Sequence, residues 1–282
     1  MAPFMAEIQA EFGAPTSLED FERKAQMLDY VDHRAIFEGM NAHLWAPNSG
    51  RMLWMTQPAW PSNTWQILTS DYDTQASFYG VKKACEPLHV QLDLSDYTVA
   101  VVNTTTGARN GLSVEADVYS LDNKSLFHHQ EKKDAPPNSV QQAFKLDLAP
   151  LMADGVVLVK LRLVDSSGAF VSDNLYWLGA SSASYRKLGR MGVATVSAAA
   201  RIEKGNVVVS LKNTGNVAAL QIKLTLLKAD GTRVLPAYYG NNYVSLLPGE
   251  NWDIAVEYPV DQTVAQVGIR GWNVAKSVVS LK

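Results

Sequence analysis

The residues of this chain that could do chemistry are few and widely spaced. Asp71 and Asp73 come closest to a carboxylate pair, the arrangement used for general acid and base catalysis. They precede a predicted helix, where acids cap the first turn and complement the helix dipole, and we favour that structural interpretation. Glu38 lies inside another helical run and is interpreted as structural for the same kind of reason.

The histidines and the cysteine do not indicate a metal site. The histidines are scattered along the chain, and the adjacent pair His128-His129 stands in a predicted loop. The single cysteine, Cys85, leaves no possibility of an internal disulfide or of a cysteine-rich metal site. We therefore expect neither a metal nor a cofactor.

The most unusual stretch is GRMLWMTQPAWP at residues 50–61. It begins like a buried strand, with a short apolar run that ends at Trp54, and then turns polar at Gln57. Two prolines bracket a second tryptophan, Trp60, and hold it on rigid turns. Two large aromatic side chains are thus placed at or after the end of a predicted strand. Their role depends on the elements that surround this strand.

Composition limits the class of protein. The 282 residues are 47% hydrophobic and 19% charged, which supports a sizeable core and argues against disorder. The formal net charge of −3 provides no basic excess for nucleic acid or for an anionic membrane surface. No apolar run approaches the ~18 residues of a membrane-spanning helix, and the first residues lack the pattern of a signal peptide. We expect no nucleic-acid partner and no membrane association.

The first 87 residues follow a helical pattern. Residues 17–20 resemble a capping box, and apolar residues then recur at spacings of three and four to a predicted helix end near Trp45. A strand around Leu53 follows, and then a second helix that stops at Pro87. These elements cannot close an α/β domain, because a parallel strand needs neighbours on both sides. They are predicted to be part of a larger α/β domain.

After residue 87 the hydrophobic period switches to that of a β-strand. Alternating segments separated by turn signals indicate one immunoglobulin-like β-sandwich at 88–180 and a second at 193–282. The small-residue stretch between them, 181–192, is interpreted as a linker. The predicted strands are 89–94, 97–101, 114–119, 140–146 and 156–164 in the first sandwich, and 206–211, 220–227, 243–247, 252–258 and 264–269 in the second.

Five segments carry a resemblance to a known family. The end of the catalytic barrel in family 2 of the glycoside hydrolases is resembled by RAIFEG at 34–39, the stretch at 50–61, DYD at 71–73 and YGVKKACEP at 79–87. YYGNNYVSLLPGE at 238–250 resembles the C-terminal immunoglobulin-like domain of the exo-β-glucosaminidase and mannosylglycoprotein endo-β-mannosidase branch. The resemblance covers nearly the whole chain.

The resemblance implies a multi-domain α/β plus all-β fold, with the terminal fragment of a (β/α)8 barrel at 1–87 followed by the two sandwiches. Enzymes of this family retain anomeric configuration and use two glutamates with carboxyls ~5 Å apart. Both glutamates lie on earlier barrel strands, and no Asn-Glu pair occurs in this chain. We therefore expect no catalytic residue here, and dependence on a missing N-terminal barrel region in the same or another polypeptide.

Within this resemblance, residues 50–61 correspond to the eighth and last barrel strand, and active sites of such barrels lie at the C-terminal strand ends. Trp54 and Trp60 would form a wall that stacks on a sugar, and Gln57 would bind a hydroxyl. The alternatives are core packing for the tryptophans and backbone capping for Gln57. Met55 and Thr56 intervene before Gln57, which departs from the family pattern of a tryptophan followed directly by a polar pair. Trp65 is expected to pack against the following helix.

The resemblance implies a β-linked mannose or glucosamine oligosaccharide, or an N-glycan, as the substrate of the parent enzyme. Mannosidase and glucosaminidase activity, and exo and endo action, both stay open at this point. A signal peptide would precede the missing barrel, as in a periplasmic or secreted parent enzyme.

Two other interpretations stay open from the sequence. The chain could be a free-standing, non-catalytic carbohydrate-binding or adhesion module, since linked sandwiches are common scaffolds for such work. It could also be one half of a split enzyme whose barrel is a separate polypeptide, in which case the helix face of Phe21, Ala25 and Leu28 would be the interface.

Overall fold

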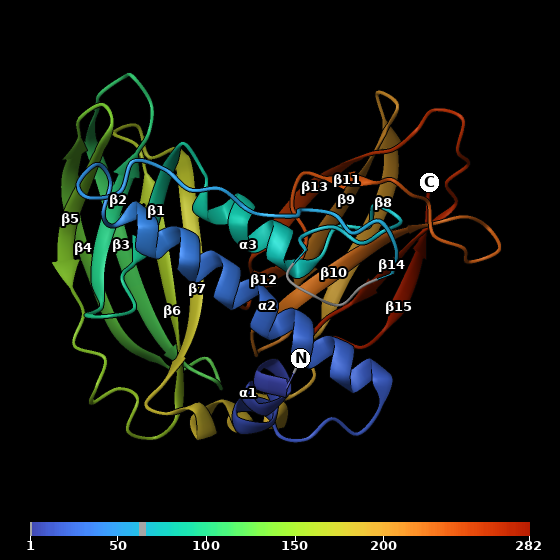
Figure 1. Cartoon of the computed structure of the whole chain (residues 1–282), viewed down its shortest axis with the longest axis horizontal. Helices are drawn as coiled ribbons and strands as arrows, with labels where there is room; N and C mark the ends of the chain where they lie inside the picture. Colours follow the sequence, from blue (N-terminus) through green and yellow to red (C-terminus); the bar gives the residue numbers. More distant parts are fainter. Residues whose placement is uncertain (1, 62–65) are drawn as a thin grey trace. The chain divides into compact units, whose positions relative to one another are not determined.

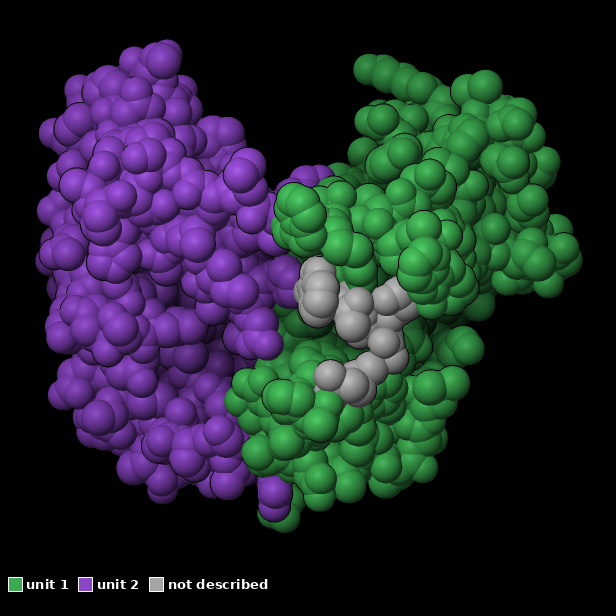
Figure 2. Space-filling model, in the orientation of Figure 1, with its two compact units in different colours: residues 1–29, 54–79, 189–282 green, residues 30–53, 80–188 purple. Residues whose placement is uncertain are grey.

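The computed structural model describes residues 2–61 and 66–282, which form two compact units (Figure 1). Unit 1 contains Met1–Asp29, Trp54–Tyr79 and Gly189–Lys282, and unit 2 contains Tyr30–Leu53 and Gly80–Leu188 (Figure 2). Each unit joins one β-sandwich to helical and irregular segments from the first part of the chain.

The predicted helical region forms α1 (Ala2–Phe12), α2 (Leu18–Asn41) and α3 (Ala76–Ala84). Helix α2 begins at the predicted cap, where Asp20 N donates to Ser17 Oγ at 3.1 Å. The return bond goes one residue further back than a capping box requires, because Asp20 Oδ2 accepts from Thr16 N at 3.0 Å. The helix ends at Asn41, before the predicted end near Trp45. None of the described helices combines the length and the apolar character that a membrane span requires.

The helix face that a split enzyme would use as an interface is largely covered by the chain itself. Leu28 is buried, and Phe21 and Ala25 are half-buried. The interface prediction for this face is therefore wrong for Leu28, whose side chain has no surface left to offer a separate barrel.

The strand predicted around Leu53 is absent, and residues 49–61 form neither helix nor strand. A parallel barrel strand takes its backbone hydrogen bonds from neighbours on both sides, and no described residue forms a β-ladder with this segment. Without such partners, no inter-strand hydrogen bonds stabilise an extended strand here. The described residues therefore show the β-sandwiches of the expected fold and do not clearly show a barrel fragment.

The sandwich of unit 2 has seven strands in two antiparallel sheets, ordered β1-β2-β5 and β4-β3-β6-β7. Its core is built from inward-facing apolar residues of both sheets, such as Val101, Val114 and Leu161. The strands are β1 (Leu88–Leu92), β2 (Thr98–Asn103), β3 (Arg109–Ser120), β4 (Ser125–Ala135), β5 (Ser139–Lys145), β6 (Val156–Val164) and β7 (Phe170–Gly179).

Strands β4 and β7 were not among the predicted strands. His128 and His129, which we predicted to stand in a loop, lie in the middle of β4. That prediction was wrong because β4 is an edge strand of its sheet, so its exposed positions accept polar residues and the hydrophobic alternation is weak.

The sandwich of unit 1 has two four-stranded sheets, ordered β12-β10-β14-β15 and β11-β13-β9-β8. Strand β10 pairs with both β12 and β14, and β9 pairs with both β8 and β13. The strands are β8 (Val196–Glu203), β9 (Asn206–Asn213), β10 (Ala219–Leu227), β11 (Tyr238–Tyr239), β12 (Val244–Leu246), β13 (Asn251–Glu257), β14 (Gln266–Arg270) and β15 (Ser277–Ser280).

The stretch interpreted as a linker contains a 3-10 helix, η1 (Ser182–Arg190). Its only buried side chain is Leu188, so the sequence shows no repeating apolar pattern that would have revealed the helix.

Candidate functional site

The stretch at residues 50–61 holds its two tryptophans out in solvent. The side chains of Trp54 and Trp60 are 82% and 71% exposed. The backbone between them is anchored, because Leu68 N donates to the carbonyl of Thr56 at 3.1 Å and Pro58 is buried. Large aromatic side chains on an anchored backbone are a costly arrangement in water unless a partner or ligand covers them.

Gln57 is half-buried next to these tryptophans. Its side-chain amide donates to the carbonyl of Ser70 at 3.5 Å, a long hydrogen bond that leaves the side-chain oxygen outside this contact. The bond corresponds to backbone capping, one of the two predicted roles. Trp65 lies outside the described residues.

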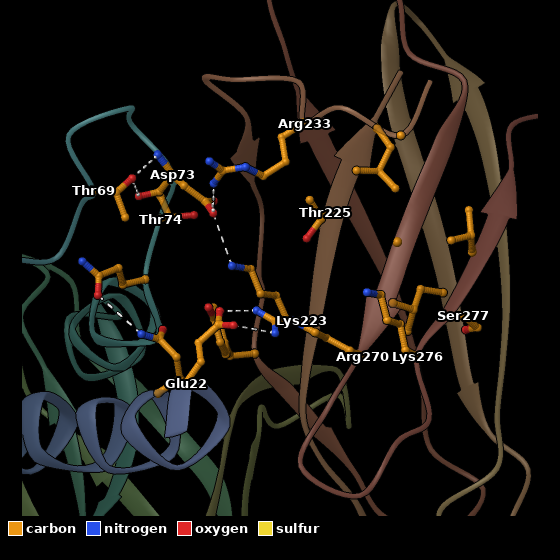
Figure 3. Close-up of a pocket in the computed structure, with 18 residues that line it drawn as sticks. Glu22, Thr69, Asp73, Thr74, Lys223, Thr225, Arg233, Arg270, Lys276 and Ser277 are labelled. Carbon is orange, nitrogen blue, oxygen red and sulfur yellow. Dashed lines mark hydrogen bonds and ion pairs between the residues drawn. The ribbon is translucent and has the colours of Figure 1, made fainter. Parts of the chain in front are cut away.

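The acidic pair before α3 is neutralised by ion pairs. Asp71 contacts Arg233 at 2.5 Å. Asp73 contacts Arg233 at 3.1 Å and Lys223 at 3.3 Å (Figure 3). The hydroxyl of Thr69 and the charge of Arg233 hold the pKa of Asp71 below its usual value. Both acids therefore serve as anchors for cations of the second sandwich, which differs from the helix-capping role that we favoured.

The first turn of α3 finds its cap elsewhere. The side-chain oxygen of Gln26, on α2, accepts from Ala76 N at 2.8 Å. A long-range glutamine thus satisfies a free backbone donor of the helix, which local sequence could not reveal.

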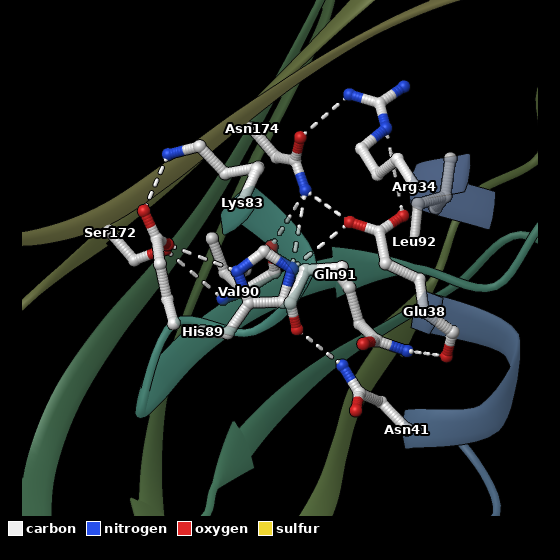
Figure 4. A network of polar contacts seen from close by, with 12 residues as sticks. Arg34, Glu38, Asn41, Lys83, His89, Val90, Gln91, Leu92, Ser172 and Asn174 are labelled. Carbon is white, nitrogen blue, oxygen red and sulfur yellow. Dashed lines mark hydrogen bonds and ion pairs between the residues drawn. The ribbon is translucent and has the colours of Figure 1, made fainter. Parts of the chain in front are cut away.

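A buried cluster of polar and charged side chains surrounds Glu38, inside unit 2 (Figure 4). Its carboxylate is 2% exposed and accepts from Asn174 Nδ2 at 2.6 Å and from the hydroxyl of Tyr176 at 2.9 Å. Arg34, one helical turn earlier, places its Nε 3.9 Å from the same carboxylate and stacks 4.1 Å from the ring centre of Tyr176. Glu38 is thereby held by neighbours on α2 and β7, in agreement with the structural interpretation.

His89 joins two carboxylates through its two ring nitrogens. Nε2 lies 3.0 Å from Glu38 Oε1, and Nδ1 lies 3.1 Å from Glu86 Oε2. Burial alone would lower the pKa of His89, but the hydrogen bonds and charges of both glutamates raise it. Because each nitrogen faces an acceptor, the geometry fits the imidazolium form, in which both nitrogens donate.

A second group of charges continues the cluster towards β6. Lys83 on α3 contacts Glu86 at 2.7 Å and Asp173 at 3.3 Å, and Lys160 contacts Asp173 at 2.6 Å. Burial would raise the pKa of Asp173, but Lys160 and Lys83 together lower it to about 2.

Every charged side chain of this cluster has a partner of opposite charge, so the arrangement fastens α2 and α3 to the sheet edges of β1 and β7 within unit 2. It presents no spare acid or base to a substrate. Among the described residues, no three His, Cys, Asp or Glu side chains are grouped as metal ligands. The sequence did not single out Asn174, Asp173 and Lys160 as members of this cluster. The one feature that could have identified them is that each is a polar residue within an otherwise apolar strand.

Two family models match the sandwich regions. Residues 95–180 match the mannosidase Ig/CBM-like domain, and residues 174–274 match the exo-β-D-glucosaminidase Ig-fold domain. These matches place both sandwiches in domain types found in glycosidases.

Relatives match nearly the whole chain. Exo-β-D-glucosaminidases of Arthroderma benhamiae and Streptomyces avermitilis are each 31% identical, over 96% and 97% of this chain. The mannosylglycoprotein endo-β-mannosidase of Lilium longiflorum is 27% identical over 96% of it. The crystal structure of the Amycolatopsis orientalis exo-chitosanase superposes with a TM-score of 0.92 at 28% identity, over 99% of this chain.

The chain is similar over nearly its whole length to exo-β-glucosaminidases and to an endo-β-mannosidase, the branch of glycoside hydrolase family 2 that the sequence resembles. The resemblance stated from the sequence is thereby confirmed. The chain spans about a third of the length of the curated relatives it matches, 33% and 34% for the first two and 35% for the third. It covers 37% of the exo-chitosanase chain and corresponds to the C-terminal part of such enzymes.

A more distant solved structure agrees on the fold. The β-D-mannosidase of Dictyoglomus thermophilum superposes over 98% of this chain with a TM-score of 0.75 at 18% identity. At that level of identity the likeness concerns the arrangement of helices and strands alone.

Proposed function

We propose that this chain is the C-terminal portion of a retaining β-glycosidase that hydrolyses β-glucosaminidic or β-mannosidic bonds. Its domains are the end of the catalytic barrel at 1–87, one sandwich at 88–180, a connecting segment at 181–192 and a second sandwich at 193–282. The two catalytic glutamates belong to the barrel region outside this chain.

Within that enzyme, Trp54, Gln57 and Trp60 form one wall of the sugar site. The observation that carries this proposal is the exposure of Trp54 and Trp60 on a segment that has no strand partner in the described part of the chain. In a complete barrel, neighbouring strands would supply that partner, and the C-terminal end of the last strand would face the active site. Indole faces then stack on the apolar face of a sugar, where their quadrupole attracts the polarised C–H groups.

The buried cluster around Glu38 and the charge pairs of Asp71 and Asp73 hold the end of the barrel in position. Both bind segments of the first 87 residues to a sandwich through contacts that lie inside one unit. The sandwiches therefore act as a scaffold for the wall. Because catalysis belongs to the barrel, the sandwiches need no carboxylate pair free for catalysis.

The proposed substrate of the parent enzyme is inferred from the names of the relatives. The two relatives at 31% identity are both exo-β-D-glucosaminidases, although others of that name, at 27% and 28%, are about as similar to this chain as the endo-β-mannosidase at 27%. We therefore favour β-linked glucosamine oligosaccharides over β-linked mannose in oligosaccharides or N-glycans.

The test is the intact mass and activity of the native polypeptide that carries this sequence, purified with whatever accompanies it. We expect a mass well above 30.9 kDa, or a tightly bound partner with barrel sequence, together with hydrolysis of β-glucosaminides. A single inactive chain of 30.9 kDa that binds chitosan or mannan would instead support a free-standing binding module.

A further inference from the structure

Unit 1 contains a cavity of about 490 Å³ on the outer face of the sheet β12-β10-β14-β15 (Figure 3). Its opposite wall is formed by α2 and the segment before α3, both within the same unit. The volume falls in the range of small-molecule sites and fits a ligand the size of one or two sugar rings.

The floor of the cavity is hollow because of one glycine. Gly268 on β14 pairs with Thr225 on β10 and with Val278 on β15. Since paired residues share a face of the sheet, a larger side chain at this position would fill the cavity. A methyl group built there would lie 3.3 Å from the side chain of Leu227, and the backbone of Gly268 has no positive φ. The glycine thus leaves room without being required by local backbone geometry.

A row of cations crosses the three strands next to this hollow. Lys223 pairs with Arg270 across β10 and β14, and Lys276 immediately precedes the Ser277 that pairs with Ile269. All three cations line the cavity, and Arg233 adds a fourth. Figure 3 shows Lys223, Arg233, Arg270 and Lys276 around the same space.

The carboxylates of the lining do not balance these cations. Glu22 is bound to the guanidinium of Arg270, with one contact at 2.9 Å, and Asp73 is shared by Lys223 and Arg233. Lys276 is exposed and makes no ion pair with a described residue. The lining carries four cationic groups and two carboxylates, and Asp71, which lies outside the lining, also binds Arg233. One cation, Lys276, is then left without a carboxylate partner among the described residues.

We propose that this cavity is a binding site for a sugar that carries an oxyanion, either a carboxylate or a phosphate. The oxyanion lies against Lys276, the cation of the lining that no carboxylate of the described residues pairs. Hydroxyl groups of the ring meet the side chain of Thr225, and the exposed side chain of Val278, on the same face of the sheet, contacts the apolar face of the ring. The site is separate from the tryptophan wall and does not depend on the proposed glycosidase activity.

The experiment is a titration of the full chain by calorimetry with glucuronate and with glucose 6-phosphate, and with neutral glucose as the reference ligand. We expect a Kd of about 1 mM or tighter for at least one anion, and binding at least about tenfold weaker for glucose. The preferred anion identifies whether the carboxylate or the phosphate is the natural group. Affinity should fall with added salt, because the excess charge is exposed.

Three variants locate the site. Lys276→Glu should weaken anion binding at least about tenfold, whereas Lys212→Glu makes the same charge change on β9, outside the cavity lining, and should leave binding within about twofold. Gly268→Val should abolish binding of all three ligands while the unfolding midpoint stays close to that of the unchanged chain. Trp54→Ala should have no effect.

Three results would overturn the proposal. The first is no heat of binding from either anion at about 10 mM. The second is equal affinity for glucose and the anions, and the third is equal loss in the Lys276→Glu and Lys212→Glu variants. A loss in Trp54→Ala would assign the binding to the tryptophan wall instead.

Discussion

The cluster around Glu38 permits a prediction with a magnitude. Glu38→Gln keeps the size of the side chain but removes its charge and one acceptor. Oxygen Oε1 receives hydrogen bonds from His89 and Asn174, and Oε2 receives one from Tyr176. In either orientation of a glutamine amide, the NH2 group would face a donor, and Arg34 would lose the opposite charge beside it.

The cost follows from burial. Both side chains of the Arg34–Glu38 pair are about fully buried, at 3% and 2% exposure, so removal of one partner leaves a charge that water does not screen. Breaking such a pair costs about 3–5 kcal/mol, and we expect Glu38→Gln to lower the free energy of unfolding of unit 2 by about that amount. The matched control is Glu131→Gln on β4, whose side chain is 42% exposed and whose loss should cost under about 1 kcal/mol.

The assay is urea unfolding combined with amide hydrogen exchange. Exchange in β1 and β7 reports on unit 2 separately, because local protection follows the stability of the cooperative unit that contains the amide. A Glu38→Gln variant that exchanges no faster in these strands than Glu131→Gln would refute the idea that the cluster fastens α2 to the sandwich.

Three further predictions concern charge and packing. Burial alone would lower the pKa of His89, but Glu38 and Glu86 raise it in the folded chain, so its charge stabilises fully below the unfolded pKa of about 6.5 and this contribution is lost as the pH rises through the folded value. The gap in urea midpoint between the unchanged chain and His89→Gln should therefore shrink as the pH is raised above about 6.5, and a constant gap would contradict this. Asp73→Asn should cost about 2–4 kcal/mol by urea unfolding, because it removes the opposite charge beside the mostly buried Lys223. Asp71→Asn removes an exposed ion pair with Arg233 and keeps an oxygen for the hydroxyl of Thr69, so it should cost under about 1 kcal/mol, and equal costs would show that burial does not matter here. Gly80→Ala should lower the melting temperature, because the added methyl would lie 2.5 Å from a backbone carbonyl oxygen of α2. The loss in free energy of unfolding should exceed the ~1 kcal/mol of a typical substitution. An unchanged melting temperature would mean that α2 and α3 are not packed this closely.

The sandwich strands that the sequence predicted have in common that every second residue is apolar. Segments 114–119, 156–164 and 206–211 each place every second side chain in a core, and each lies inside an observed strand, β3, β6 and β9. Edge strand β4 escaped prediction because its outer face and part of its inner face are polar. Strand β7 escaped because Asp173 and Asn174, polar residues bound to partners on other elements, interrupt its apolar run.

The strand predicted around Leu53 failed for a different physical reason. Its apolar run is typical of a strand, but no strand of the described residues pairs with it to form a ladder. Local pattern indicates which residues prefer to be buried, and only the partner strands decide whether the backbone becomes a sheet. The same limit applies to Glu38 and His89, since their roles depend on residues up to 138 positions away along the chain.

The exposure of Trp54 and Trp60 could not be predicted from the sequence, because a tryptophan in an apolar run favours burial on composition alone. The family resemblance supplied the expectation of an aromatic wall, and the geometry is compatible with it. The wall itself remains the central proposal.

The most direct test of that proposal is kcat/KM for a β-glucosaminide, measured on the complete polypeptide that carries this sequence together with its barrel. Trp54→Ala should lower kcat/KM at least about tenfold, equivalent to about 1.4 kcal/mol of lost transition-state binding, without a change in unfolding midpoint. Tyr238→Ala, which removes a comparably exposed aromatic ring from the second sandwich, should leave kcat/KM unchanged. Full activity in the Trp54→Ala enzyme would contradict the account, because the exposed ring would then have no part in sugar binding.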